Sequence, residues 1–129
     1  MIIGKHFEFE AAHMLPDEEC YGKCRNLHGH TYKLTVEVIG KITDKGWVCN
    51  FSEVKAVVQE RVIKVLDHAY LNDIIADLTT AENILWWMRQ QIQAEIEDQT
   101  GAVLYCLTLY ETSNSFAKLY CSGSIDPNS

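Results

Sequence analysis

The segment HGHTYKLTVEVI, residues 28–39, carries the clearest structural pattern in the chain. Its apolar side chains fall on every second position, and a period of two is typical of a β-strand with one face in the protein interior. The inward-facing set predicted by this pattern is His30, Tyr32, Leu34, Val36 and Val38. His28 shares their parity, so two imidazoles are predicted to point to one face, with the small Gly29 between them.

A second strand with the same alternation is predicted at residues 5–13. Its inward-facing positions are Phe7, Phe9, Ala11 and His13. We expect the two strands to be neighbours, because consecutive strands usually pair. A third imidazole, that of His13, is therefore predicted to point to the same interior face.

The rest of the chain changes from a strand period to a helix period and back. Apolar residues recur at helical spacing after Ser52, the predicted cap of a first helix, and Thr79 and Glu82 stand at capping-box spacing before a second. The further predicted elements are a short strand at 46–51, a helix at 52–66, a loop at 67–73, a helix at 80–98, and strands at 103–111 and 116–121.

The predicted order β-β-β-α-α-β-β indicates an α+β fold with a mainly antiparallel sheet and both helices on one face. One domain over residues 1–121 holds all of these elements, and the polar tail at 122–129 is expected to fray. A domain of this size buries only about two-thirds of the surface of its unfolded chain, so association with further copies would add stability.

Composition limits the partners of the chain. With 18 acidic and 11 basic residues it has a formal net charge of −7, so it lacks the basic surface that nucleic acid or an anionic membrane requires. Its N-terminal sequence does not resemble a signal peptide, and no segment approaches about 18 apolar residues. We therefore expect a cytoplasmic protein without a membrane anchor, in which the five cysteines are reduced.

His13, His28 and His30 are predicted to converge on one metal ion. Three neutral imidazoles suit zinc and leave one tetrahedral position for water or substrate, which is the arrangement of a catalytic site. Cys20 or Cys24 as a fourth protein ligand would instead close the site and make the zinc structural. The residue types alone leave both alternatives open.

Four other residues are candidates for chemistry beside the metal. A cationic neighbourhood would favour the thiolate of Cys24, which is a base or a nucleophile. Asp67 can orient the adjacent His68 as a proton donor, and Glu111 ends an inward-facing strand where the amidine-like edge of a pterin or guanine would offer it two donors. Taken singly, each residue also fits an ordinary role as a loop cysteine, a solvated loop residue or a strand-end glutamate turned to water.

Six motifs, spread over nearly the whole chain, are Phe9-Glu10-Ala11-Ala12-His13, the run from Cys24 to His30, Asn50-Phe51, Leu66-Asp67-His68, Thr80-Ala81-Glu82-Asn83 and Tyr110-Glu111-Thr112. In this order they resemble the family of 6-pyruvoyl- and 6-carboxy-tetrahydropterin synthases. The interval of four positions from Cys24 to His28 is similar to that of the bacterial 6-carboxy enzymes, whereas the pyruvoyl enzymes of animals usually have a longer one. The resemblance thus favours the carboxy branch, which serves queuosine biosynthesis.

The resemblance implies a zinc-dependent conversion of 7,8-dihydroneopterin triphosphate to 6-carboxy-5,6,7,8-tetrahydropterin, with release of acetaldehyde and triphosphate. The roles it implies are zinc ligands for His13, His28 and His30, general base for Cys24, acid for His68 oriented by Asp67, pterin anchor for Glu111, and weaker ring contacts for Thr80. Two alternatives are the pyruvoyl-forming reaction, which eliminates triphosphate and keeps the three-carbon side chain, and a non-catalytic zinc-stabilised protein that binds a pterin.

The resemblance also implies the tunnelling fold, in which two helices back a four-stranded antiparallel sheet and subunits join into a barrel. Such proteins are commonly hexamers made of two trimers, with active sites between subunits that bind a small-molecule substrate. One departure from the family pattern is Asn50, where relatives commonly have aspartate. We expect this change to alter a loop hydrogen bond more than catalysis.

Overall fold

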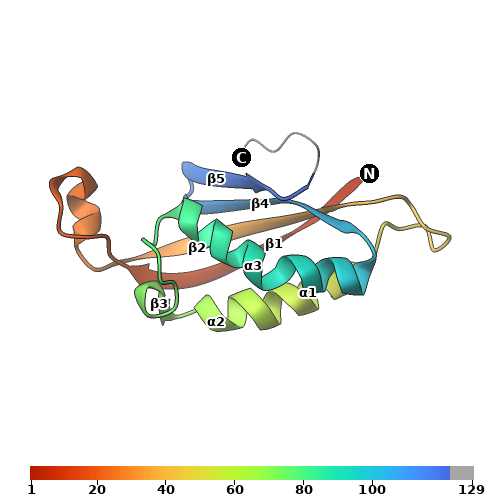
Figure 1. The fold of residues 1–129 in the computed structure, drawn as a ribbon, viewed down its shortest axis with the longest axis horizontal. Helices are drawn as coiled ribbons and strands as arrows, with labels where there is room; N and C mark the ends of the chain where they lie inside the picture. The colour runs from red at the N-terminus through yellow and green to blue at the C-terminus, as the bar shows by residue number, and fades with distance from the viewer. Residues whose placement is uncertain (123–129) are drawn as a thin grey trace.

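The chain folds into a mainly antiparallel sheet with helices on one of its faces (Figure 1). The structure is a computed structural model and is described over residues 1–122. The strands are β1 (Ile2–His13), β2 (His28–Ile39), β3 (Ala69–Tyr70), β4 (Val103–Thr112) and β5 (Ser115–Tyr120). The helical segments are η1 (Glu19–Arg25), α1 (Phe51–Val58), η2 (Gln59–Ile63), α2 (Lys64–Leu66), η3 (Leu71–Asp73) and α3 (Ala81–Thr100).

The sheet has the strand order β3-β1-β2-β4-β5 and does not close on itself within the described chain. β1 and β2 pair along their whole length, from Ile2 opposite Ile39 to His13 opposite His28. β4 pairs antiparallel with β2 and with β5, whereas the two-residue β3 pairs parallel with β1. The long β1–β2 pair therefore brings two of the three predicted histidine ligands directly opposite each other.

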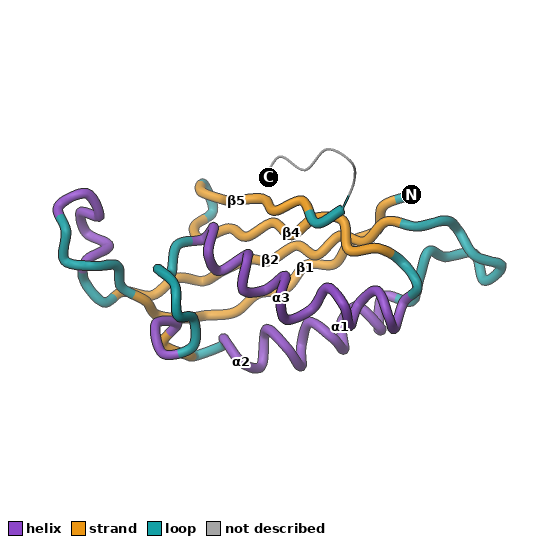
Figure 2. The backbone as a smooth tube through the Cα atoms, in the orientation of Figure 1, coloured by secondary structure: helices purple, strands orange, loops and turns teal. Residues whose placement is uncertain are grey.

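The helical layer consists of α3 and the nearly continuous segment α1–η2–α2 (Figure 2). Asn50 caps α1, because its side chain accepts a hydrogen bond from the Ser52 N–H at 2.9 Å and Glu53 accepts one from the Asn50 N–H at 3.2 Å. The prediction of Ser52 as the cap was wrong by two residues. The amide oxygen of Asn50 fills that role instead, so this departure from the family pattern keeps a capping function.

The predicted capping box would make Thr79 the N-cap of α3, but the helix begins one residue later. Thr80 is its N-cap, and the Thr80 hydroxyl accepts a hydrogen bond from the N–H of Asn83 at 3.3 Å. Thr79 is instead fully buried, and its carbonyl and hydroxyl contact His13. Gly101 ends the helix with a φ of 74°, a left-handed conformation that glycine adopts without the steric cost of a Cβ.

The hydrophobic core lies between the helical layer and the inward face of the sheet. Alternate residues of β2, from Tyr32 to Val38, are at most 1% exposed, as the alternation predicted. The residues that α3 buries against this face include Ile84, Leu85, Met88, Ile92 and Ile96. Burial of one such side chain contributes about 1.5–3 kcal/mol relative to its exposure. The same parity carries His13 inward at the end of β1, where it is 1% exposed.

The strand predicted at residues 46–51 was wrong. Residues 46–49 form bends that follow a turn at 44–45, and Phe51 is the first residue of α1. Gly46 has a φ of 83° and donates its N–H to the Thr43 carbonyl, which closes a turn. Val48 and Cys49 pack into the core without pairing to a strand. The apolar character of this segment therefore reflects core contact and not a sheet ladder.

The segment predicted as a loop, residues 67–73, contains β3 and η3. β3 adds a fifth strand to the four that the family resemblance implies, because Ala69 and Tyr70 pair with Ala11 and Ala12. All five cysteines are free thiols. No helix within residues 1–122 is both long enough and apolar enough to cross a membrane. Of the predicted polar tail at 122–129, the part from residue 123 onward lies outside the described residues.

Candidate active site

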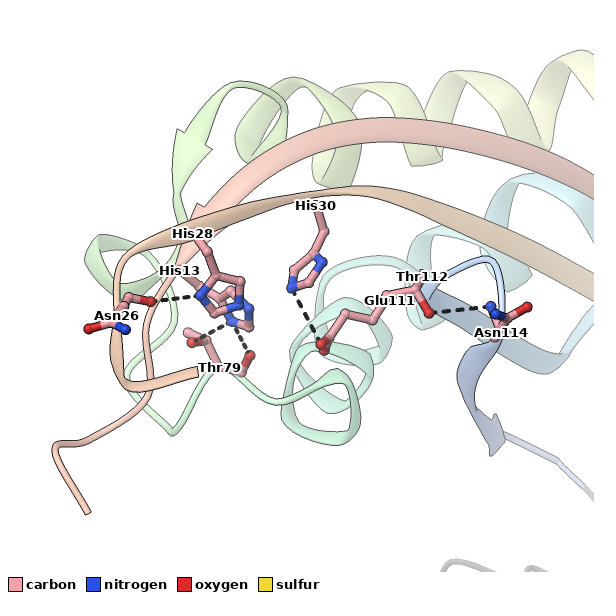
Figure 3. Close-up of polar contacts among 8 residues, drawn as sticks. All are labelled: His13, Asn26, His28, His30, Thr79, Glu111, Thr112 and Asn114. Carbon is pink, nitrogen blue, oxygen red and sulfur yellow. Dashed lines mark hydrogen bonds and ion pairs between the residues drawn. The ribbon is translucent and has the colours of Figure 1, made fainter. Parts of the chain in front are cut away.

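The three predicted histidines lie together at one end of the sheet (Figure 3). His13 is the last residue of β1, and His28 and His30 stand at the start of β2. One ring nitrogen of each lies within 4.8 Å of the ring nitrogens of the other two. The ring centroids are 4.5 Å apart for His13 and His28, 5.1 Å for His13 and His30, and 4.8 Å for His28 and His30. We call these residues the histidine cluster.

Backbone carbonyls fix the orientation of two of these rings. Nδ1 of His13 lies 2.8 Å from the Thr79 carbonyl oxygen and 3.2 Å from the Thr79 hydroxyl, and Nδ1 of His28 lies 2.7 Å from the Asn26 carbonyl oxygen. A carbonyl only accepts hydrogen bonds, so each Nδ1 carries the proton and donates it. The lone pair of each ring is then on Nε2, which is the arrangement of a histidine metal ligand.

The buried ring nitrogens of the histidine cluster fit a metal ion. Nε2 of His13 and Nε2 of His30 are both buried without a hydrogen-bond partner among residues 1–122, which is costly for a polar atom in a protein interior. Burial is the main factor that lowers the pKa of both residues below 6.5, and the neighbouring His28 lowers it further. Neutral imidazoles with unused lone pairs are the donors that zinc prefers in a three-histidine site.

No cysteine belongs to the set of described side chains that could hold one ion together with the histidine cluster. Cys20 is exposed, and Cys24 is half-buried in η1. This grouping favours the open site over the closed, structural one. Cys24 still lies near the strand end that carries His13, because its carbonyl accepts a hydrogen bond from the N–H of Leu15 at 2.8 Å.

Glu111 lies beside the histidine cluster near the end of β4. Its Oε1 is 3.4 Å from Nε2 of His30, and its side chain is 25% exposed. The following turn is stabilised by the Asn114 N–H, which donates to the Thr112 hydroxyl (Figure 3). The carboxylate therefore stands at the boundary between the core and the solvent, where a ligand can reach it.

A cavity of about 230 Å³ opens next to Glu111. Its lining residues are Ala81, Glu82, Glu111, Ser115, Phe116 and Ala117. Thr80, the cap of α3, directly precedes the lining residue Ala81 and is not itself among the lining residues. The cavity thus joins the carboxylate of Glu111 to the N-terminal turn of α3.

Asp67 and His68 form a hydrogen-bonded pair after α2. Asp67 Oδ1 accepts the Glu10 N–H at 3.0 Å, and Asp67 Oδ2 lies 3.0 Å from Nδ1 of His68. The Glu10 N–H, followed by the hydrogen bond to His68, holds the pKa of the Asp67 carboxyl below its ordinary value. The carboxylate is therefore ionised and orients the imidazole. His68 has a φ of 60°, an uncommon and strained conformation for a residue with a Cβ.

The Asp67–His68 pair is not on the side of the sheet that carries the histidine cluster. Nε2 of His68 lies 3.8 Å from Oε2 of Glu10, and Glu10 is an exposed residue of β1 whose parity is opposite to that of His13. Successive side chains of a strand point to opposite faces. Of the predicted site residues, the structure therefore gathers the three histidines with Glu111 and leaves His68, 75% exposed, on the other face.

Asn72 and Thr79 support the cluster but were not predicted as site residues. Asn72 accepts from the Met14 N–H at 3.1 Å, donates to the Met14 carbonyl at 2.9 Å, and accepts from the Thr79 hydroxyl at 3.3 Å. Thr79 in turn holds Nδ1 of His13. No motif marks Asn72, because its contacts to Met14 join residues 58 positions apart.

These features define a class of α+β protein in which three imidazoles, two of them with a buried Nε2 atom that lacks a hydrogen-bond partner among residues 1–122, stand at the end of a mainly antiparallel sheet backed by helices. The chain belongs to the 6-pyruvoyl tetrahydropterin synthase family, whose family model matches residues 2–121. The family predicted from the six motifs is thereby confirmed.

The relatives that match most of the chain include proteins named for the 6-carboxy product and proteins named for the 6-pyruvoyl product. It is 40% identical over 132 residues to the 6-carboxy-5,6,7,8-tetrahydropterin synthase of Synechocystis sp., covering 98% of this chain and 97% of that protein. It is 34% identical over 128 residues to the 6-pyruvoyl tetrahydrobiopterin synthase of Homo sapiens, covering 88% and 86%. The solved structure of Caenorhabditis elegans 6-pyruvoyl tetrahydropterin synthase matches with a TM-score of 0.81 at 25% identity, over 95% and 96% of the two chains. The predicted tunnelling-fold class is confirmed.

Proposed function

We propose that this chain is a zinc-dependent 6-carboxy-5,6,7,8-tetrahydropterin synthase. It converts 7,8-dihydroneopterin triphosphate to 6-carboxy-5,6,7,8-tetrahydropterin, with release of acetaldehyde and triphosphate, as a step of queuosine biosynthesis. The observation that carries the proposal is the histidine cluster, in which the buried Nε2 atoms of His13 and His30 lack a hydrogen-bond partner among residues 1–122 and Glu111 lies 3.4 Å from that of His30. The near full-length similarity to the Synechocystis protein and the short interval from Cys24 to His28 support the carboxy product.

His13, His28 and His30 would hold the zinc ion. When bound, zinc supplies Lewis-acid polarisation of the hydroxyl groups on the substrate side chain. The chain contributes the preset tautomers of His13 and His28, which direct Nε2 to a common point. Because no cysteine joins the cluster in the described chain, part of the coordination sphere is left for substrate.

Glu111 would anchor the pterin ring. Its half-buried carboxylate can accept two hydrogen bonds from the amidine-like edge of a pterin, and such charge-assisted pairs are stronger than neutral ones. The cavity beside it offers about 230 Å³ along the first turn of α3. Thr80, which precedes the lining residue Ala81, is the weaker candidate for contact with the ring.

Cys24 and His68 would move the protons. In this proposal the Cys24 thiolate removes a proton from the substrate side chain, and His68, oriented by Asp67, delivers a proton in return. The hydrogen bond from His68 Nδ1 to Asp67 suits this role, because it leaves Nε2, which lies 3.8 Å from Oε2 of Glu10, as the ring atom that exchanges a proton. A thiol base also requires a reducing compartment, which supports a cytoplasmic enzyme.

The separation of His68 from the cluster supports an active site shared between subunits. Within one chain the Asp67–His68 pair lies across the sheet from the histidine cluster. β5 is the last strand in the order of the described sheet, and an edge strand can pair with a strand of a neighbouring subunit. A barrel of subunits, in a hexamer of two trimers, would place the pair of one subunit at the cluster of the next.

Two other functions fit parts of the same site. The pyruvoyl-forming reaction eliminates triphosphate and keeps the three-carbon side chain, so acetaldehyde distinguishes the two enzymes. A non-catalytic pterin-binding protein would need the zinc cluster and Glu111 but would have no use for Cys24 or an oriented His68. The presence of Cys24, Asp67 and His68 favours an enzyme.

The test is to incubate the zinc-loaded protein with 7,8-dihydroneopterin triphosphate and to measure acetaldehyde, triphosphate and the pterin product. We expect equal amounts of acetaldehyde and the 6-carboxy product. Cys24→Ala should abolish turnover and leave the zinc content intact, while the matched Cys20→Ala variant stays active because Cys20 is exposed and has no assigned role. A pterin product without acetaldehyde would replace the carboxy assignment with the pyruvoyl one, and a fully active Cys24→Ala variant would remove Cys24 as the base.

A further inference from the structure

Tyr32 carries a buried hydroxyl group that lacks a hydrogen-bond partner in the described chain. The residue is 0% exposed, in the middle of the inward face of β2. Buried polar side-chain atoms are satisfied in the great majority of cases, and an unpaired hydroxyl costs stability. A phenylalanine would fill the same space without that cost, so the hydroxyl needs an explanation outside folding.

The surroundings of Tyr32 connect this hydroxyl with the histidine cluster. Tyr32 follows His30 by two positions and shares its face of the strand, and the two ring centroids are 5.5 Å apart. The ring of His13 is 6.3 Å away. On its other side Tyr32 stacks on Phe9 at 5.0 Å with an angle of 10° between the planes. This stacking fixes the ring, so the hydroxyl group has a set position.

Glu111, the proposed pterin anchor, lies beside the same residue. The register of β2 with β4 pairs Lys33 with Tyr110, which sets Glu111 opposite Tyr32 on the neighbouring strand. A phenol can donate its proton in a hydrogen bond, so Tyr32 offers a donor group beside both the proposed anchor and the ring of His30.

We propose that the Tyr32 hydroxyl donates a hydrogen bond to an oxygen atom of the substrate's three-carbon side chain, and that the bound substrate supplies its missing partner. This inference rests on the proposed function, because it assumes a pterin ligand with its side chain toward the histidine cluster. The side chain is the nearest part of such a ligand, since Tyr32 contacts the rings of His13 and His30. The chain thereby gains a specificity-determining contact in addition to its proton-transfer residues.

Tyr32→Phe removes only the hydroxyl, and Tyr105→Phe is the matched control on β4, where Tyr105 contacts Tyr120 at 5.8 Å. Because the Tyr32 hydroxyl has no partner in the free protein, we expect the Phe variant to unfold in urea at or above the wild-type midpoint. A lower midpoint would show that the hydroxyl is already paired in the free protein, and that result overturns the proposal.

Binding is then measured with two probes, neopterin, which carries the trihydroxypropyl side chain, and pterin, which has none. One hydrogen bond is equivalent to about a tenfold change in affinity. We expect Tyr32→Phe to bind neopterin about tenfold more weakly than wild type and to bind pterin equally well, while Tyr105→Phe changes neither. An equal loss for both probes, or no loss for neopterin, overturns the proposal.

The two probes also distinguish this inference from the proposed function. Wild-type protein that binds neither probe would contradict the proposed pterin site, and the inference would fall with it. Wild-type protein that binds both, with a Tyr32→Phe variant that does not discriminate between them, contradicts the Tyr32 contact alone. If Tyr32→Phe weakens the binding of neopterin alone and the wild-type protein produces no acetaldehyde, the Tyr32 contact is retained and the carboxy-forming reaction is refuted.

Discussion

The rings of His13 and His28 are oriented by peptide carbonyls and not by carboxylates. A neutral acceptor on Nδ1 fixes the tautomer without adding a negative charge that would favour a protonated ring. Alternation along the strands predicted all three imidazoles on one face from the sequence. It could not predict Thr79 or Asn26 as partners, because these contacts depend on where the adjoining loops pass.

Metal-free protein should lose stability as the pH falls below about 6.5. Burial holds the pKa values of His13 and His30 below the ordinary value, so the unfolded chain binds more protons than the folded one in this range. The free energy of unfolding is then highest above about pH 6.5 and decreases as these histidines protonate in the unfolded state. Urea titrations of the metal-free protein at about pH 7.5 and about pH 5.5 measure the effect.

Two variants test the origin of this pH dependence of stability. His13→Gln should reduce the pH dependence between these two conditions, whereas His6→Gln, on the opposite face of β1, should leave it unchanged. If the free energy of unfolding of the His13→Gln variant decreases as steeply with falling pH as that of wild type, the pH dependence belongs to other groups.

Among the secondary-structure elements, those with strong periodicity were predicted and those that depend on tertiary contact were not. β1, β2, β4, β5 and both long helical segments follow from alternation or helical spacing. The predicted strand at 46–51 failed because Val48 and Cys49 are apolar for core packing alone. β3 was missed because a strand of two residues, Ala69 and Tyr70, is too short to show an alternation of apolar and polar side chains. It also pairs parallel with β1, which is distant in the sequence.

Asn50→Ala should destabilise the protein by about 1 kcal/mol, because it removes the side-chain cap of α1. Asn50→Asp, which replaces the amide with a carboxylate that can accept the same hydrogen bond, should keep the cap and the wild-type stability. Chemical denaturation measures both variants, with the zinc content held constant. Equal stability of Asn50→Ala and wild type would show that the cap contributes nothing.

Asn72→Ala should weaken zinc binding by about 10- to 100-fold, the usual effect of removing an outer partner of a metal ligand. The side chain of Asn72 joins Met14, which follows His13, to Thr79, which holds the His13 ring. Competition with a chelator measures the affinity independently of activity. Gln99→Ala, which removes a surface contact to Glu95, is the control and should bind zinc as wild type does.

At the level of the whole molecule, one chain does not unite the proposed base, acid and metal ligands. The resemblance to the family led us to expect sites between subunits, and the position of His68 across the sheet from the histidine cluster agrees with that expectation. Composition and periodicity alone could not have predicted it, because the face that a loop residue takes depends on the packing of α2 and β3.

Two inactive variants should therefore restore activity when they are mixed. Cys24→Ala subunits retain His68, and His68→Ala subunits retain Cys24, so some interfaces in mixed oligomers contain both groups. With random assembly from equal amounts, about a quarter of the sites should be complete. The measurement is acetaldehyde production after the variants are unfolded together and refolded with zinc.

Each variant refolded alone is the control and should remain inactive. A mixture that stays inactive, although its subunits exchange and its mass shows assembly, would mean that Cys24 and His68 act within one chain.

The left-handed backbone of His68 has a consequence for attempts to improve this protein. A φ of 60° strains any residue with a Cβ, and glycine would relieve that strain while it removed the imidazole. Because we propose His68 as the acid of the reaction, laboratory evolution for heat resistance alone should accumulate glycine at position 68 and yield stable variants without activity. Screens that demand turnover at every round should keep the histidine and place their stabilising changes elsewhere.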